Sequence, residues 1–210
     1  MASNKKGLPA QLFAAIFAFA AAVIPAQALD TTNIAFVQTV SATTSIPVGH
    51  LEFCQSRPDE CRPHANPVGA VSLTENLWQQ LLSVNASVNQ SIVPVTDDQL
   101  YQVAEFWTYP NGYGDCEDYA LAKRRDLINA GWPASTLLMA VVKQANGEGH
   151  AVLMVRTDRG DLVLDNQVGS VDLWSATPYK FIKRQSQADA GKWVDMIDTR
   201  EIVVATAAIN

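Results

Sequence analysis

Apolar residues recur at helical spacing between positions 73 and 88. One of them returns every three or four residues, which predicts an amphipathic helix with one face in the core. Ser72 and Glu75 stand three residues apart, as in a capping box, and mark the start of this helix. A shorter helix is predicted to begin at Thr96 and to end before Pro110. The apolar positions of the longer helix are Leu73, Leu77, Trp78, Leu81, Leu82, Val84 and Val88.

A third helix is predicted from Cys116 to about Ala130, because acidic residues suit its N-terminal end and Gly131 follows its last turn. Beyond Pro133 the pattern changes to β-rich runs that are separated by turn sequences. Helices followed by consecutive strands predict an α+β fold, in which the helices pack on an antiparallel β-sheet. The predicted strands are Leu137–Lys143, His150–Thr157, Asp161–Asp165, Tyr179–Arg184 and Ile202–Ala207.

The first 28 residues have the pattern of a secretory signal peptide. Lys5 and Lys6 precede an unbroken apolar run at 12–24, and small residues at 26–28 supply a cleavage site. A retained membrane anchor is the rival interpretation, but the run is short for a span. We therefore expect residues 1–28 to be removed and residues 29–210 to form a single domain. A bacterial periplasm is the expected compartment, although the signal alone leaves secretion open.

Composition narrows the classes of function. The chain has 210 residues, of which 48% are hydrophobic and 17% are charged, so one folded domain with a sizeable core is expected. Disorder and coiled coil do not fit these fractions. The formal net charge of −6 favours neither nucleic acid nor an anionic membrane surface as a partner.

Residues 29–69 carry proline, serine and threonine throughout and are predicted to be irregular. Cys54 and Cys61 lie in this region on either side of a proline turn. Export to an oxidising compartment favours a disulfide between them over two free thiols. His50 and His64 lie in the same region and are predicted to be exposed.

Cys116 is left without a cysteine partner, and an unpaired cysteine in an exported protein calls for a reason. It stands at a predicted helix start, where peptide dipoles and free N–H groups stabilise a thiolate. The adjacent carboxylates work against that stabilisation. A histidine partner is therefore needed to activate the thiol.

His150 is the best-placed histidine for this task, because it opens a predicted strand beside glycines that leave room for a substrate. Asp165 ends the following strand, so the acid and the thiol can hold the two nitrogens of the imidazole. The register stays open. A turn centred on residues 159–160 separates the two residues by several positions, whereas one centred on 157–158 places them opposite each other. The spacing of the three residues alone does not define a triad. A buried cysteine, a histidine at a strand edge and an aspartate in a turn, none of them catalytic, would give the same sequence pattern.

Three carboxylates flank the cysteine, at Asp115, Glu117 and Asp118, and they repel one another unless a positive charge lies among them. Lys123 or Arg124 could supply it from the same helix. Ca²⁺ would do so better, because it takes several carboxylate and carbonyl oxygens. Ordinary helix-start acids without any metal produce the same pattern.

Three blocks of sequence resemble the bacterial transglutaminase-like cysteine proteinases. They are Gly114–Lys123 (GDCEDYALAK), Gly149–Leu153 (GHAVL) and Leu162–Asn166 (LVLDN), and the order Cys, His, Asp is shared. The resemblance extends from the helix near Trp78 to Ser186. This group includes the LapG-type periplasmic proteases, which release biofilm adhesins.

The resemblance implies a papain-like core with the cysteine at a helix start against an antiparallel sheet. It assigns Cys116 as nucleophile, His150 as general base and acid, and Asp165 as the residue that orients the histidine. It also implies calcium near the site. The calcium ligands would be Asp115, Glu117 and Asp118.

The resemblance further implies the kind of partner. In LapG-type members the substrate is a large surface adhesin cut near its N-terminal end at paired alanines. The periplasmic domain of an inner-membrane receptor, which senses cyclic di-GMP in the cytoplasm, sequesters the protease. Two other functions stay open: acyl transfer to an amine, as in true transglutaminases, and a non-catalytic calcium-dependent binding protein.

Overall fold

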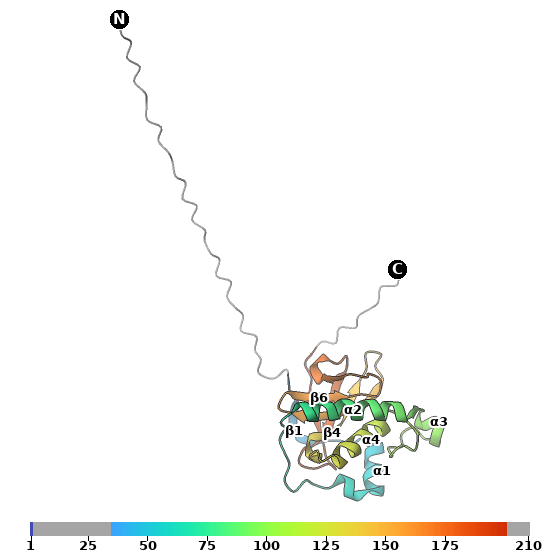
Figure 1. The fold of residues 1–210 in the computed structure, drawn as a ribbon. Coiled ribbons are helices and arrows are strands. Elements are labelled where there is room, and N and C mark those ends of the chain that lie inside the picture. The colour runs from blue at the N-terminus through green and yellow to red at the C-terminus, as the bar shows by residue number, and fades with distance from the viewer. Residues whose placement is uncertain (2–34, 201–210) are drawn as a thin grey trace. The chain divides into compact units, whose positions relative to one another are not determined.

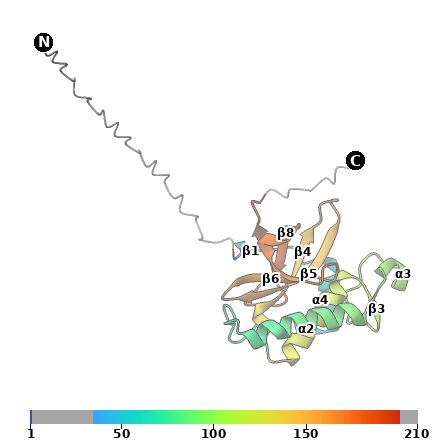
Figure 2. The ribbon, with the colours of Figure 1, turned by 45° about the horizontal axis from the view of Figure 1, so that its top comes forward.

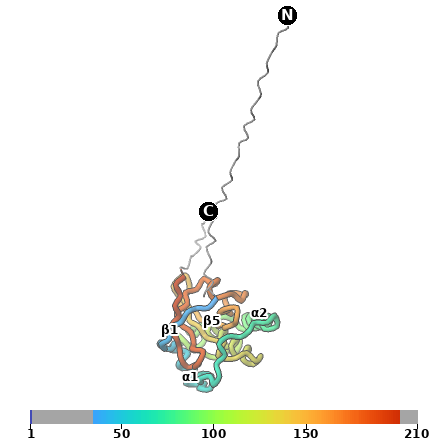
Figure 3. Tube along the Cα trace, turned by 90° about the vertical axis from the view of Figure 1, so that its left-hand side faces the viewer, coloured from blue at the N-terminus to red at the C-terminus, as the bar shows by residue number. Residues whose placement is uncertain are grey.

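One antiparallel sheet of seven strands, in the order β1-β9-β8-β4-β5-β6-β7, organises the chain. The structure is a computed structural model that describes Met1 and residues 35–200. Figure 3 shows β1 beside the C-terminal strands, where it pairs with β9 at the edge of the sheet. The strands are β1 (Gln38–Thr44), β4 (Leu137–Lys143), β5 (Gly149–Thr157), β6 (Gly160–Leu164), β7 (Val171–Leu173), β8 (Lys180–Gln185) and β9 (Trp193–Ile197).

Helices α2 and α4 pack against each other, and α4 lies on β4 and β5. Figures 1 and 2 show both helices on one side of the sheet, with α3 projecting at one end. A short parallel pair of strands, β2 (Val93–Pro94) with β3 (Tyr113–Gly114), lies on either side of α3 in the sequence and joins its segment to α2 and α4. The α-helices are α1 (Val48–Ser56), α2 (Glu75–Ser91), α3 (Asp97–Tyr101) and α4 (Cys116–Asn129), and the 3₁₀-helices are η1 (Pro58–Cys61), η2 (Ala134–Thr136) and η3 (Trp174–Ala176).

The central strands are buried on both faces, which explains why β4 is an unbroken apolar run. Alternate side chains of a strand point to opposite faces. Leu137 and Met139 accordingly join the core between sheet and helices, together with Leu81 of α2. Leu138 and Phe181 belong to a second core on the other face.

The predicted α+β class with helices on an antiparallel sheet is confirmed. The bounds predicted for β4 are those found, and α4 begins at Cys116 as expected. The predicted strand at 202–207 and the expected signal peptide at 1–28 both lie outside the described residues. Among the described residues, no helix combines the length and hydropathy that a membrane span requires.

Two predictions about the N-terminal half are wrong. Residues 29–69 are not irregular throughout, because β1 and α1 lie within them. Helix α2 begins at Glu75 with Thr74 as its N-cap, whose side chain accepts the Leu77 N–H. Ser72 instead donates its hydroxyl to Asp158, at 3.0 Å, so the expected capping box does not form.

The predicted disulfide between Cys54 and Cys61 is confirmed, and it joins α1 to η1. The prediction that His50 is exposed is wrong, because α1 packs this ring against β9. The indole N–H of Trp193 donates to His50 Nδ1 at 3.0 Å, and burial, followed by the charge of Arg124, lowers the pKa of His50 to about 4. His64 is half-buried rather than exposed.

Replacing Cys54 and Cys61 by serine is expected to lower the free energy of unfolding by about 2 kcal/mol, because the cross-link restricts only a short loop of the unfolded chain. Denaturant unfolding of the variant and the wild type measures this difference. Wild type with and without reductant is the control. Equal stability of the oxidised and reduced forms would contradict the expectation.

Candidate active site

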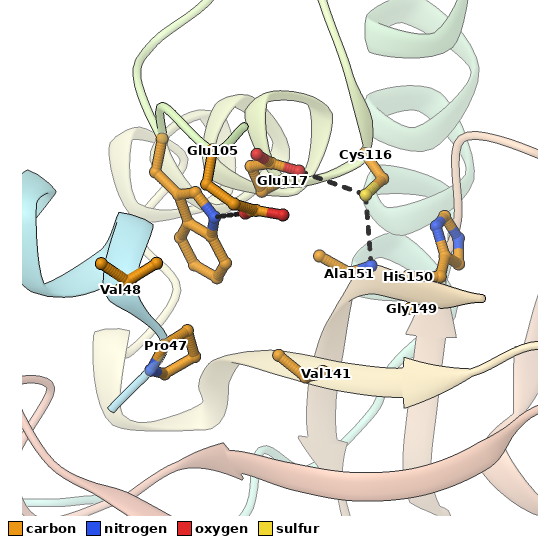
Figure 4. A pocket seen from close by; sticks show the side chains of 10 residues that line it. Pro47, Val48, Glu105, Cys116, Glu117, Val141, Gly149, His150 and Ala151 are labelled. Atoms are coloured by element: carbon orange, nitrogen blue, oxygen red, sulfur yellow. Dashed lines mark hydrogen bonds between the residues drawn. The ribbon is translucent and has the colours of Figure 1, made fainter. Parts of the chain in front are cut away.

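Cys116 is the first residue of α4, and its thiol is held from two sides. The backbone N–H of Ala151 donates to Sγ at 3.3 Å, which ties the thiol to the start of β5. The thiol in turn donates to Glu117 Oε2 at 3.2 Å, as the dashed lines in Figure 4 show. The turn before the helix needs Gly114, because a Cβ there would stand 2.5 Å from Asp118 Oδ2.

The structure brings His150 and Asp165 together, as the sequence predicted. His150 Nε2 and Asp165 Oδ1 are 2.9 Å apart, and both side chains are buried. The hairpin pairs Thr157 with Gly160, so its two-residue turn lies at Asp158 and Arg159, between the two alternatives considered from sequence. The pair is therefore offset diagonally on one face of the sheet rather than directly opposite.

Asp165 is equipped to remain ionised. Burial opposes its ionisation, but hydrogen bonds from His150, Tyr179 and the backbone N–H of Gln167 outweigh it. The pKa of the carboxyl is consequently held below its usual value. An ionised acceptor fixes the proton of His150 on Nε2, which leaves Nδ1 as the basic nitrogen.

Cys116 and His150 line the same cavity, and Figure 4 shows their side chains next to each other. This cavity has a volume of about 370 Å³, and Pro47, Val48 and Val141 form its apolar wall. Among the described residues, the thiol is hydrogen-bonded to Ala151 and Glu117. The thiol and the imidazole therefore lie next to each other without a hydrogen bond between them.

A second cavity, of about 380 Å³, shares Cys116 and His150 with the first. Its other walls are more polar and include Thr96, Gln99 and Gln167. The thiol therefore stands between an apolar and a polar recess. Such an arrangement can hold a polypeptide with the residues before one peptide bond in one recess and the residues after that bond in the other.

The electrostatics of the thiol are unfavourable in this arrangement. Burial raises the pKa of Cys116 well above its ordinary value, and the charge of Glu117 raises it further. Glu117 is itself buried, and burial together with the charge of Asp115 raises its pKa to about 10. A positive charge among these carboxylates would lower the pKa of the thiol.

The carboxylate cluster consists of Asp97, Asp115 and Glu117, and one oxygen from each lies within 4.8 Å of the other two. Asp97 is 2% exposed, and its Oδ1 has no hydrogen-bond partner among the described residues. Asp115 Oδ1 is likewise buried and unpartnered there. Buried carboxylate oxygens without partners are costly, and their convergence suits a hard divalent cation.

Asp118, which the sequence groups with Asp115 and Glu117, lies outside this cluster of three, although its Oδ2 is also buried without a partner among the described residues. Its Oδ1 accepts the backbone N–H of Thr108 at 2.9 Å, and burial raises its pKa to about 7. Arg124 does not neutralise the cluster either, since it donates to the Leu137 carbonyl at 3.1 Å and to Glu60 at 3.4 Å.

Lys123, the other basic residue considered from the sequence, is buried on α4. Burial lowers the pKa of this lysine to about 7, against the opposing effect of the Asp165 charge. Its electrostatic partner is thus the acid of the histidine pair rather than the carboxylate cluster.

Asp97 is the site residue that the sequence reasoning missed. It stands 18 positions before Asp115, and its backbone N–H donates to Asp115 Oδ2 at 3.2 Å. The β2–β3 pairing and the Thr96 N-cap of α3 bring it there. No spacing rule for calcium loops covers such a pair, so an acidic residue opening a short helix was the only available signal.

A thiol at a helix start beside a histidine–aspartate pair on an antiparallel sheet is typical of cysteine peptidases with a transglutaminase-like fold. The comparison of sequences defines the group more closely. The profile of the bacterial transglutaminase-like cysteine proteinases matches residues 40–201, and the chain belongs to this family of cysteine peptidases.

Solved structures of LapG from Legionella pneumophila are similar to this chain. The calcium-bound structure is 27% identical, with 51% of this chain and 64% of that chain covered, at a TM-score of 0.47. The EGTA-treated structure is 25% identical, with 60% and 69% covered, at a TM-score of 0.48. The chain thus spans less than two thirds of the calcium-bound structure's length. The comparison with curated proteins finds no match.

Proposed function

We propose that this chain is an exported cysteine endopeptidase that cleaves a protein substrate with Cys116, His150 and Asp165. The observation that carries the proposal is the His150 Nε2–Asp165 contact of 2.9 Å beside a cavity that Cys116 and His150 line together. Family membership supports the same reaction class.

The proposed reaction begins at His150 Nδ1, the nitrogen that Asp165 leaves unprotonated. Nδ1 takes the thiol proton, and the thiolate attacks a backbone carbonyl carbon of the substrate. The negative charge of Asp165 stabilises the imidazolium that forms. The backbone N–H of Cys116, at the first position of α4, has no acceptor within the helix and can donate to the developing oxyanion.

The second half of the reaction uses the same residues in reverse. His150 donates its proton from Nδ1 to the leaving amine, and the amide bond breaks to give an acyl-enzyme on Cys116 Sγ. Water then adds to the thioester carbonyl while His150 removes a proton from it. The C–S bond then breaks, His150 returns the proton to Sγ, and the new carboxyl terminus is released.

We assign calcium to the cluster of Asp97, Asp115 and Glu117. The unpartnered buried oxygens of the two aspartates support a cation at this place. When bound, Ca²⁺ supplies positive charge that lowers the pKa of the neighbouring thiol. Asp115 and Glu117 flank Cys116 directly, so ligation also fixes the first turn of α4.

A large cell-surface adhesin is the substrate that we propose, and the periplasm is the proposed compartment. The resemblance of the Cys, His and Asp blocks to LapG-type periplasmic proteases supports both, together with the signal-peptide pattern at 1–28. The two recesses beside Cys116 suit a flexible polypeptide segment.

The periplasmic domain of an inner-membrane receptor is the proposed regulatory partner, and release of the adhesin would regulate biofilm formation.

Hydrolysis and acyl transfer are separated by their products. Incubation of the calcium-supplemented protein with a peptide substrate and excess glycine ethyl ester is expected to give free carboxyl termini. Mass spectrometry of the products measures the ratio of hydrolysed to amidated peptide. Predominant incorporation of the amine would favour the transglutaminase-type alternative, and binding of peptide without any new product would favour the non-catalytic one.

A further inference from the structure

The two carboxylate oxygens of Asp165 have different partners. Oδ1 contacts His150 Nε2 at 2.9 Å and accepts the backbone N–H of Gln167 at 3.0 Å. Oδ2 accepts the hydroxyl of Tyr179. Asp165 and Tyr179 are only 3% and 4% exposed, so this hydroxyl is a deeply placed partner of the carboxylate.

Tyr179 also contacts the imidazole itself. Its ring centroid lies 5.3 Å from that of His150, with an interplanar angle of 55°. One side chain thus packs against the histidine and holds the carboxylate that orients it. Burial, followed by the hydrogen bond to Asp165, raises the pKa of Tyr179, so the hydroxyl keeps its proton and remains a donor.

The segment that carries Tyr179 is itself held in place by Arg200. The guanidinium donates to the carbonyls of Trp174, Thr177 and Tyr179, at 3.0, 3.3 and 2.7 Å. It lies 4.3 Å from the Trp174 ring centroid and donates to both oxygens of Asp198, at 2.9 and 2.8 Å. A backbone fixed at three carbonyls leaves the tyrosine hydroxyl little freedom to move.

We propose that Tyr179 is a positioning residue, whose hydroxyl holds Asp165 so that Oδ1 faces His150. This inference rests on the proposed function of the triad. Without the hydroxyl, Oδ2 would be a buried carboxylate oxygen with no donor, which is costly. The carboxylate would turn toward other donors, and the imidazole would lose the partner that fixes its orientation and its proton.

The test is Tyr179→Phe, which keeps the ring and removes the hydroxyl. We expect kcat to fall about tenfold with KM unchanged, because a hydrogen bond to a charged acceptor is lost behind the histidine. The proton resonance of His150 Nε2–H should move upfield and exchange faster with water. The matched control is Tyr109→Phe, which removes a hydroxyl that donates to another carboxylate, Glu60, at 2.8 Å.

Two results would overturn the positioning role: an unchanged kcat in Tyr179→Phe, or a lower kcat with the His150 resonance at its wild-type position. The resonance separates this inference from the proposed function. If the wild type hydrolyses no peptide, the proposed function fails. A shifted resonance in Tyr179→Phe, but not in Tyr109→Phe, still supports the positioning of His150 through Asp165, and an unshifted one refutes it.

Discussion

Alanine at position 116 is expected to abolish peptide-bond hydrolysis while leaving the free energy of unfolding close to that of the wild type. The substitution removes only the nucleophile, so the loss should be roughly 10⁴-fold or more. Cys116→Ser should be equally inactive. Product formation by mass spectrometry and denaturant unfolding measure the two quantities on the same preparations.

His150→Ala should be about as damaging as Cys116→Ala, because the members of a catalytic unit are not additive. The double variant should therefore be no worse than either single variant. His64→Ala is the matched control, since His64 is a half-buried histidine that lines neither cavity. Hydrolysis by Cys116→Ser at the wild-type rate would refute the assignment of the nucleophile.

Calcium removal is expected to reduce the activity strongly, and calcium add-back should restore it. The physical reason is the cluster of Asp97, Asp115 and Glu117 beside Cys116, because burial, followed by the charges of Glu117 and Asp115, raises the pKa of the thiol. EGTA titration of activity measures the dependence. Asp115→Ala and Glu117→Ala should lose activity although neither carboxylate reacts with the substrate.

Asp97→Asn gives the sharpest test of the calcium ligands. The amide oxygen can still accept the Phe106 N–H, but the charge is lost, so calcium affinity should fall by roughly 100-fold or more. Asp98→Asn is the control, because Asp98 is next to Asp97 in the sequence but its carboxylate is exposed. Calorimetry measures both affinities. Full activity in EGTA, with no calcium binding to the wild type, would leave these carboxylates as ordinary helix-start acids.

The central part of the fold could be predicted because its elements carry strong patterns. β4 is a continuous apolar run, and α4 has acids at its start and a glycine after its end. β1 could not be predicted in this way, since it is a mostly exposed edge strand in which most residues are polar. The burial of His50 was missed for a related reason, because its partner Trp193 is 143 positions away.

The candidate site shows the same division. The block around Cys116, the strand position of His150 and the place of Asp165 directly after a strand are local features, and the predicted contact of His150 with Asp165 is present in the structure. Tyr179 has no local signal, and the only local signal of Asp97 is an acidic residue at the start of a short helix. Each reaches the site only because the chain folds back, through the β2–β3 pairing for Asp97 and through the turn after η3 for Tyr179. The catalytic roles themselves stay predictions.

Sequencing of cleavage products is the most direct test of peptide-bond hydrolysis by Cys116 and His150. The calcium-supplemented wild type is incubated with a mixture of unstructured peptides that covers all pairs of adjacent residues, and new termini are identified by mass spectrometry. We expect new amino and carboxyl termini that are absent with Cys116→Ser and with His150→Ala. The same termini in Cys116→Ser, or none from a folded wild type that binds calcium, would contradict the proposed hydrolysis by Cys116.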